Sequence, residues 1–287
     1  MSTYTITNGR LTASIRSLGA ELCSIVDNAT GREFMWQGDA NVWGGQSPLL
    51  FPVIGRVVGG KNRIYGEDYP MPMHGFARKM EFEAESVMED SVCLLLRDNE
   101  ETHKVYPFNF ELRILLYFRQ DSVVMEHKVT NLSEKDMYFC LGAHPGFFCA
   151  EGDILRLEVP ETLTLRGLDI PADLLSPAKK TFNAENGTIA LSSELFKDDA
   201  LMFENIRSRS VTLERADGSS VHVEYCDAPC LGVWSKPIYP LRYVCIEPWY
   251  GIDDATDASG EFTEKPHCRA VAPNATFAFP VRITPKA

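Results

Sequence analysis

The sequence predicts an all-β protein, a large antiparallel β-sandwich, and three observations support this fold class. Apolar and polar residues alternate with a period of two through most of the chain, which is the pattern of half-buried strands. Asn8-Gly9 and Asp217-Gly218 each separate two such segments, and these dipeptides favour two-residue hairpin turns. Short helices are expected only around residues 172–175 and 192–196. Many short strands with few helices are typical of a sandwich.

The alternating segments follow one another along the whole chain, and no linker, composition break or repeat separates them. We therefore expect one domain over residues 1–287. Residues 47–60 are apolar and contain two closely spaced prolines, which favours an irregular segment lining a site over a regular central strand. Residues 163–182 are expected to be rich in loops, and the acidic residues 253–264 to form a solvated rim. The expected strands are residues 3–8, 10–16, 20–26, 33–36, 79–87, 92–98, 110–118, 122–131, 137–141, 154–159, 197–203, 211–215, 220–225, 231–236, 242–249 and 275–283.

Composition limits the class of partner and the compartment. Of the 287 residues, 45% are hydrophobic and 24% are charged, which predicts a folded protein with a sizeable core. The formal net charge of −12 argues against nucleic acid and anionic membrane surfaces as partners, whereas a neutral small ligand is compatible with it. The N-terminus lacks the pattern of a signal peptide, and no apolar run is long enough to span a bilayer. The eight cysteines are scattered, so we expect free thiols in the cytoplasm.

A small set of polar side chains at strand ends or in proline-spaced loops can carry chemistry. His144 lies in a turn between Gly142 and Gly146, where glycine permits close approach of the backbone to a ligand and proline fixes the turn. Glu247 ends an apolar run, so burial is expected to raise its pKa and make it a general base. Each has a structural alternative, a loop hydrogen bond for His144 and an ion pair with Arg242 for Glu247. The full set is Arg56, His74, His144, Glu247 and one of the pair Asp198 and Asp199.

A histidine and a glutamate that converge on one pocket form an acid/base pair that needs no metal or cofactor. Such a pair suits proton exchange on a sugar hemiacetal, in which the carboxylate accepts the proton of the anomeric hydroxyl and the imidazolium donates one to the ring oxygen. A neighbouring carboxylate is expected to keep the His144 imidazole charged. Arg56 and His74 can bind sugar oxygens, and Trp234 or Trp249 can pack against the pyranose ring.

Seven sequence motifs, spread from about residue 45 to residue 250, together resemble the aldose 1-epimerase (galactose mutarotase) superfamily, and more narrowly its LacX-like branch. They are Leu49-Leu-Phe-Pro-Val-Ile-Gly-Arg56, Met71-Pro-Met-His74-Gly-Phe-Ala-Arg78, Tyr106-Pro-Phe-Asn-Phe110, Leu141-Gly-Ala-His144-Pro-Gly-Phe147, Asp198-Asp199-Ala200-Leu201, Gly232-Val-Trp234-Ser-Lys-Pro237 and Cys245-Ile-Glu247-Pro-Trp249.

The resemblance implies a single-domain β-supersandwich of the galactose mutarotase type, with a sugar-binding groove and no cofactor. By the same resemblance, His144 is the general acid, Glu247 is the general base, and Arg56 and His74 bind the substrate. The family's sugar-binding aspartate falls on Asp199 or, as the alternative, on its neighbour Asp198. The sequence leaves the natural sugar open, and a monomer and a homodimer are both compatible with it.

Four alternatives to a mutarotase acting on a free sugar stay open. Hexose-6-phosphate mutarotases carry a similar His-Gly-Phe-Ala-Arg loop, in which Arg78 would hold a phosphate. A carbohydrate-binding protein without catalysis would use the same fold. A metal site could draw on His74, His144 and Glu247, although their spacing does not support it. A glycosidase could use Asp199 and Glu247 as paired carboxylates, but both histidines would then lack a role.

Overall fold

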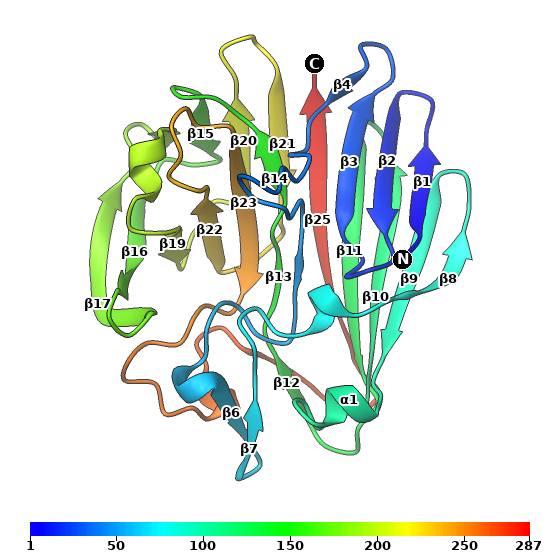
Figure 1. Ribbon diagram of the computed structural model, residues 1–287, viewed down its shortest axis with the longest axis vertical. Helices are drawn as coiled ribbons and strands as arrows, with labels where there is room; N and C mark the ends of the chain where they lie inside the picture. Colours follow the sequence, from blue (N-terminus) through cyan, green and yellow to red (C-terminus); the bar gives the residue numbers. More distant parts are fainter.

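The computed structural model describes residues 1–287, and antiparallel sheets make up almost all of its regular structure (Figure 1). The largest sheet has nine strands, in the order β18 (Thr188–Ala190), β15 (Ile154–Leu157), β20 (Ser210–Glu214), β21 (Ser220–Glu224), β25 (Thr276–Lys286), β11 (Ser122–Asn131), β10 (Phe110–Arg119), β9 (Ser91–Arg97) and β8 (Glu83–Val87). A second sheet runs in the order β17 (Leu174–Asn183), β16 (Thr162–Asp169), β19 (Leu201–Glu204), β22 (Cys230–Trp234), β23 (Tyr243–Tyr250), β13 (Leu141–Ala143) and β5 (Leu49–Leu50), and β14 (Gly146–Phe148) also pairs with β23.

Three smaller sheets complete the fold. The N-terminal sheet contains β1 (Thr3–Thr7), β2 (Leu11–Arg16), β3 (Leu22–Asp27) and β4 (Arg32–Glu33). The two-stranded sheets are β6 (Lys61–Ile64) with β7 (Glu67–Pro70), and β12 (Met137–Phe139) with β24 (Arg269–Val271). The helical elements are α1 (Glu100–His103) and 3₁₀ turns at Val58–Gly60, Ala77–Lys79, Ser193–Phe196 and Phe262–Glu264.

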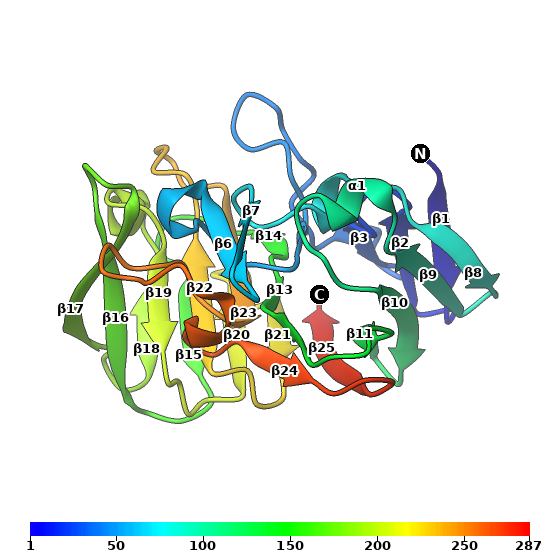
Figure 2. The same ribbon diagram turned by 90° about the horizontal axis from the view of Figure 1, so that it is seen from below.

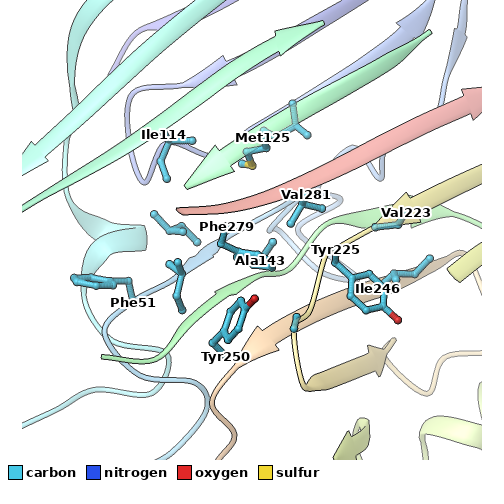
Figure 3. Close-up of a cluster of buried hydrophobic side chains, with 14 of the residues drawn as sticks. Phe51, Ile114, Met125, Ala143, Val223, Tyr225, Ile246, Tyr250, Phe279 and Val281 are labelled. Carbon is cyan, nitrogen blue, oxygen red and sulfur yellow. The ribbon is translucent and has the colours of Figure 1, made fainter. Parts of the chain in front are cut away.

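The sheets form two layers. In both views the N-terminal sheet lies over the half of the nine-stranded sheet that contains β8 to β11, and the sheet of β16 to β23 lies over the other half (Figures 1 and 2). Side chains from both layers meet between them, with Ile246 and Tyr250 of β23 facing Phe279 and Val281 of β25 (Figure 3). The rings of Tyr250 and Phe279 pack edge to face with centroids 5.0 Å apart. This arrangement confirms the predicted antiparallel β-supersandwich.

The hairpins predicted from local turn chemistry are confirmed. β1 pairs with β2 across Asn8-Gly9, and β20 pairs with β21 across Asp217-Gly218. β10 pairs with β11 in continuous register from Phe110 opposite Asn131 to Arg119 opposite Ser122. The short helical turn predicted at residues 192–196 is present at Ser193–Phe196. None of the helices has the length and apolarity that a membrane crossing requires.

The prediction for residues 163–182 is wrong, because these residues form the long hairpin of β16 and β17. β17 is the edge of its sheet and is mostly exposed, so it carries Pro177, Lys179 and Lys180 instead of alternating apolar residues. Proline and lysine are common on edge strands, where they discourage pairing with other chains. The helix expected at residues 172–175 is also absent, since Leu174 already begins β17.

Candidate active site

A cavity of about 250 Å³ opens on the face of β22 and β23 that points away from the sandwich core. Along β23, Val244 and Ile246 point into the core, so the alternation of a strand directs Cys245 and Glu247 to the opposite face. The polar and aromatic residues that line the cavity are Trp43, Arg56, His74, Arg78, His144, Asp199, Trp234, Glu247, Trp249 and Asp253.

Strand register brings His144 to Glu247. Gly142 of β13 is opposite Trp249, and Gly146 of β14 is opposite Cys245, so His144 falls opposite Glu247 in the gap between the two short strands. On the other side of β23, Glu247 is opposite Gly232 of β22. Glycine is required there because a Cβ atom would lie 2.3 Å from Cζ2 of Trp249. The Trp249 indole therefore occupies the space beside Glu247.

His144 and Glu247 form a buried contact pair. Nε2 of His144 lies 3.2 Å from Oε2 of Glu247, and the two side chains are 10% and 2% exposed. The ring of Trp43 stacks on the imidazole with centroids 5.2 Å apart, and Trp234 meets it edge-on at 5.7 Å. The alternative ion pair of Glu247 with Arg242 does not form, because Arg242 binds Asp39 at 3.1 Å.

Burial shifts both members of this pair toward their neutral forms. It lowers the pKa of His144, and it raises the pKa of Glu247 well above its usual value, with the nearby carboxylates of Asp199 and Asp253 adding to the rise. The expectation that a neighbouring carboxylate keeps His144 charged is therefore wrong for the resting pair. The neutral pair and the imidazolium–carboxylate pair contain the same number of protons. They differ only by the transfer of one proton between Nε2 and Oε2, which lie 3.2 Å apart.

His74 is held as a neutral hydrogen-bond donor. Its Nδ1 accepts the N–H of Gly55 at 3.0 Å, so its proton is on Nε2, and burial lowers its pKa well below the usual value. The residue has a φ of 63°, an uncommon conformation for a side chain other than glycine. Gly75 follows it, where a Cβ would lie 2.1 Å from the carbonyl oxygen of Phe51. The imidazole rings of His74 and His144 are perpendicular, with centroids 6.0 Å apart.

Arg56 is surrounded by carboxylates. Its Nε donates to Asp173 at 2.6 Å, and its terminal nitrogens lie 3.6 Å from Asp253 and 3.9 Å from Asp199. The backbone N–H of Arg56 also donates to Asp253, at 3.0 Å. A Cβ at Gly55 would lie 1.7 Å from Oδ1 of Asp253, so the glycine permits this close contact. Asp253 therefore fixes both the backbone and the guanidinium of Arg56.

Asp253 lines the cavity, although the sequence predicts a solvated rim for residues 253–264 and gives Asp253 no role in the site. That expectation is wrong for the first two acids of the segment: Asp253 is 5% exposed and Asp254 is 1% exposed. Asp254 pairs with the buried Lys265 and accepts the N–H of Val58 at 2.9 Å. Burial raises the pKa of Asp253 to about 6. Their position directly after the apolar strand β23 is the one sequence signal that could have indicated burial.

Of the two adjacent acids, Asp199 lines the cavity and Asp198 does not. Asp199 has a φ of 92°, and its own Oδ1 accepts the N–H of Ala200 at 2.8 Å. Because Asp199 precedes β19 in this unusual conformation, strand alternation alone could not have settled which acid faces the ligand. The other carboxylate oxygen, Oδ2, makes no such bond within its own turn and lies on the side of Arg56, at the cavity.

Four further side chains complete the cavity wall. Arg78 follows Ala77 in a 3₁₀ turn and donates to the carbonyl of Met73 at 3.0 Å, while its buried Nε has no hydrogen-bond partner. Trp234 is half-buried and Trp249 is buried. Trp43, which is not among the residues predicted for the site, is followed by Gly44 and Gly45; a Cβ at Gly45 would lie 2.7 Å from the Trp43 ring. An aromatic residue followed by two glycines in an irregular stretch was the available signal.

The structure groups a different set of possible metal ligands from the His74, His144 and Glu247 that the sequence suggested. The ligand atoms of His144, Cys245 and Glu247 lie within 4.8 Å of one another, and His74 is not part of this group. The cysteine comes from β23, two residues before Glu247 and on the same face of the strand.

The sequence model of the aldose 1-epimerase family matches residues 2–278, and the chain belongs to this family. The chromosomal and plasmid LacX proteins of Lactococcus lactis subsp. lactis are 34% and 33% identical to it in alignments of 286 positions that cover 94% of this chain and 95% of each relative. The resemblance to the LacX-like branch is thereby confirmed.

Solved structures show the same fold over the whole chain. A galactose mutarotase related enzyme from Lactobacillus acidophilus is 34% identical with a TM-score of 0.93, over 100% of this chain and 98% of that one. A galactose mutarotase-like protein from Lactobacillus casei is 26% identical with a TM-score of 0.91, over 99% and 100% of the two chains. A galactose 1-epimerase from Lactobacillus acidophilus, at 15% identity and a TM-score of 0.69 over 98% and 93%, shares the fold.

Proposed function

We propose that this protein interconverts the α and β anomers of a free aldose, with His144 as general acid and Glu247 as general base, in a single domain of residues 1–287 in the cytoplasm. The observation that carries the proposal is the 3.2 Å contact between Nε2 of His144 and Oε2 of Glu247 at the wall of the cavity. In a pyranose, the ring oxygen and the anomeric hydroxyl are bonded to the same carbon. An acid and a base that serve both oxygens must therefore be neighbours, as these two are.

The reaction follows from the proton that this pair shares. In the imidazolium–carboxylate form, Glu247 accepts the proton of the anomeric hydroxyl while His144 donates its proton to the ring oxygen. The C1–O5 bond breaks and an aldehyde forms. Rotation about C1–C2 presents the other face of the aldehyde, and the reverse proton transfers close the ring as the other anomer. The pair ends with the same number of protons as it had at the start, so no cofactor is consumed.

The remaining cavity residues suit a neutral monosaccharide. Nε2–H of His74 is a donor, Asp199 offers a carboxylate oxygen to hydroxyl groups, and Arg56 can donate to a sugar oxygen. The charge of Arg56 is already offset by Asp173, Asp199 and Asp253. A sugar phosphate at Arg56 would meet these carboxylates, whereas a neutral sugar would not be repelled. The edge-on packing of Trp234 beside His144 leaves the indole at the cavity wall for contact with the ring.

A second candidate, mutarotation of a hexose 6-phosphate, is favoured by one observation, the unpaired Nε of Arg78 at the cavity. Rotation of polarised light by fresh α-glucose, α-galactose and glucose 6-phosphate separates the two functions. We expect faster equilibration of a free sugar, and a clear preference for the phosphate would transfer the proposal to the second candidate.

The mechanism is tested with His144→Ala and Glu247→Gln, and with His222→Ala as a control on β21 of the nine-stranded sheet, where the side chain does not line the cavity. Loss of either partner should lower the rate by about 10²–10⁴-fold, the usual contribution of general acid–base catalysis. Calorimetry should still detect sugar binding, which distinguishes lost chemistry from lost recognition. Unchanged turnover in both variants would contradict the mechanism, and a protein that binds sugar but never catalyses would be a carbohydrate-binding protein of this fold.

A further inference from the structure

Cys245 is a buried thiol beside the acid/base pair, and anomer exchange gives it no role. It lies on β23 with 0% exposure, opposite Gly146 and two residues before Glu247. The ligand atoms of His144, Cys245 and Glu247 all lie within 4.8 Å of one another. Thus a thiol, an imidazole and a carboxyl group meet at one point, two of them at the wall of the cavity.

These three groups are zinc ligands with a spacing close to that of a zinc site. Zinc bonds of about 2.0–2.3 Å to nitrogen, oxygen and sulfur place tetrahedral ligand atoms roughly 3–4 Å apart. The 3.2 Å between His144 and Glu247 falls in this range, and a small inward movement of the Cys245 sulfur would bring it in as well. Magnesium and calcium prefer oxygen ligands, so the thiol selects for zinc and other thiophilic ions.

Charge also favours a divalent cation at this point. A thiolate and a carboxylate together carry the charge that a divalent ion neutralises, so the buried group would have no net charge. The carboxylates of Asp199 and Asp253 line the same cavity and add negative potential. The opposing positive charges at the cavity are Arg56 and Arg78, and Arg56 is already paired with carboxylates.

We propose that His144, Cys245 and Glu247 form a three-ligand site for zinc or a similar thiophilic divalent cation, and that its occupation switches off the acid/base pair. The inhibitory half of this proposal rests on the proposed function, whereas the binding half does not. On binding, the thiol and the histidine–glutamate pair each release one proton to solvent, and bonds form from the metal to sulfur, nitrogen and oxygen without any change of oxidation state. The fourth ligand position is open to water from the cavity.

The burial of Cys245 bears on the rate at which a metal ion reaches the site. Cys245 is fully buried and does not line the cavity, whereas His144 and Glu247 do, so an ion that enters from the cavity meets the histidine and the glutamate before the thiol. We therefore expect slow onset of binding, and protection by sugar in the cavity.

Binding is tested on the full chain by titration with Cd²⁺, whose bond to a thiolate absorbs in the near ultraviolet. We expect one equivalent to produce this absorption slowly, with release of about two protons. Cys245→Ala should weaken binding by more than about 100-fold, beyond the 10–100-fold effect typical of residues behind the ligands. Cys226→Ser, which removes an exposed thiol, should leave the absorption intact. Absorption that survives in Cys245→Ala, or that disappears in Cys226→Ser, would overturn the site.

Inhibition is tested separately by adding Zn²⁺ to the mutarotation assay. Wild-type activity should fall with time and return on addition of a chelator, and excess Mg²⁺ should have no effect. Cys245→Ala and Cys245→Ser should keep their basal turnover and resist zinc; thermal melting shows whether each variant is folded, and either one is sufficient. Cadmium binding without loss of activity would remove the inhibitory half alone. Absence of activity under all conditions would count against the proposed function, while the cadmium titration would still decide the site.

Discussion

His144 lies directly opposite Glu247 across an antiparallel ladder that is interrupted at Pro145. The pairs Gly142–Trp249 and Gly146–Cys245 bracket this position, and the carbonyl of Pro145 accepts the N–H of Ile246 at 3.1 Å. Proline has no N–H to return, so the ladder opens at the point where the imidazole must reach the carboxyl group. The separation of the two proton-transfer groups is thus set by strand register, and side-chain flexibility contributes little to it.

Gly232→Ala should disturb the site through Trp249. The new Cβ would lie 2.3 Å from the indole, which would be displaced toward Glu247. We expect a loss of about 1–3 kcal/mol of stability from overpacking, with lower turnover. Gly167→Ala is the matched control in the same sheet, since nothing lies within 4 Å of its added Cβ. Chemical denaturation and the rotation assay measure both effects, and equal behaviour of the two variants would show that Gly232 is not needed for packing.

Asp253→Asn should weaken sugar binding without unfolding the protein. The amide oxygen can still accept the N–H of Arg56, but the negative charge beside the guanidinium is lost. Since the folded pKa of about 6 exceeds the ordinary value of 3.8, ionisation of Asp253 costs stability as the pH rises from 3.8 through 6. The variant should therefore melt at the same temperature or higher at pH 7, with a raised KM. Asp257→Asn, exposed on the same segment, should change neither quantity.

Trp43→Ala should raise the pKa of His144, because the stacked indole helps to keep water from the imidazole. NMR titration of the imidazole C–H signals measures this shift directly. Turnover should fall by roughly 10-fold, since the ring also loses its orientation. Trp43→Phe keeps a stacking face and should lie close to the wild type. A histidine pKa that does not move in Trp43→Ala would assign the burial of His144 to other residues.

Stability should fall in mild acid because of His127, which lies far from the site on β11. Burial lowers the pKa of His127 to about 4, and its Nδ1–H donates to the carbonyl of Phe279 at 2.9 Å. Between pH 6.5 and 4 the unfolded chain binds a proton that the folded protein does not, so stability declines as the pH falls through this window, by up to about 3 kcal/mol. Denaturation of His127→Gln between pH 4 and 7 measures the free energy of unfolding as a function of pH. Its slope should correspond to about one proton fewer than in the wild type. An unchanged slope would show that groups other than His127 cause the loss of stability in acid.

Local chemistry was enough to predict the hairpins, because a turn such as Asn8-Gly9 depends only on its own residues. The edge strand β17 escaped prediction because an exposed strand with Lys179 and Lys180 has no buried face to produce alternation. The residues of the candidate site likewise fall into those that the sequence indicated and those that depend on distant contacts. Motifs indicated His144 and Glu247, but the contribution of Asp253 depends on a contact with Arg56 from a segment almost two hundred residues earlier in the chain.

By itself, therefore, the sequence determined the all-β class, the family resemblance and the identities of the chemical groups, since each of these is written in local patterns and motifs. Only the tertiary structure decided that Asp199 and not Asp198 lines the cavity, that Cys245 lies beside the acid/base pair, and that burial shifts the pKa values of both members of the pair toward their neutral forms. The physical reason is that a pKa depends on the water and charges removed or gathered around a group, and a ligand set depends on distances across strands. Both are products of packing between segments that are remote in sequence.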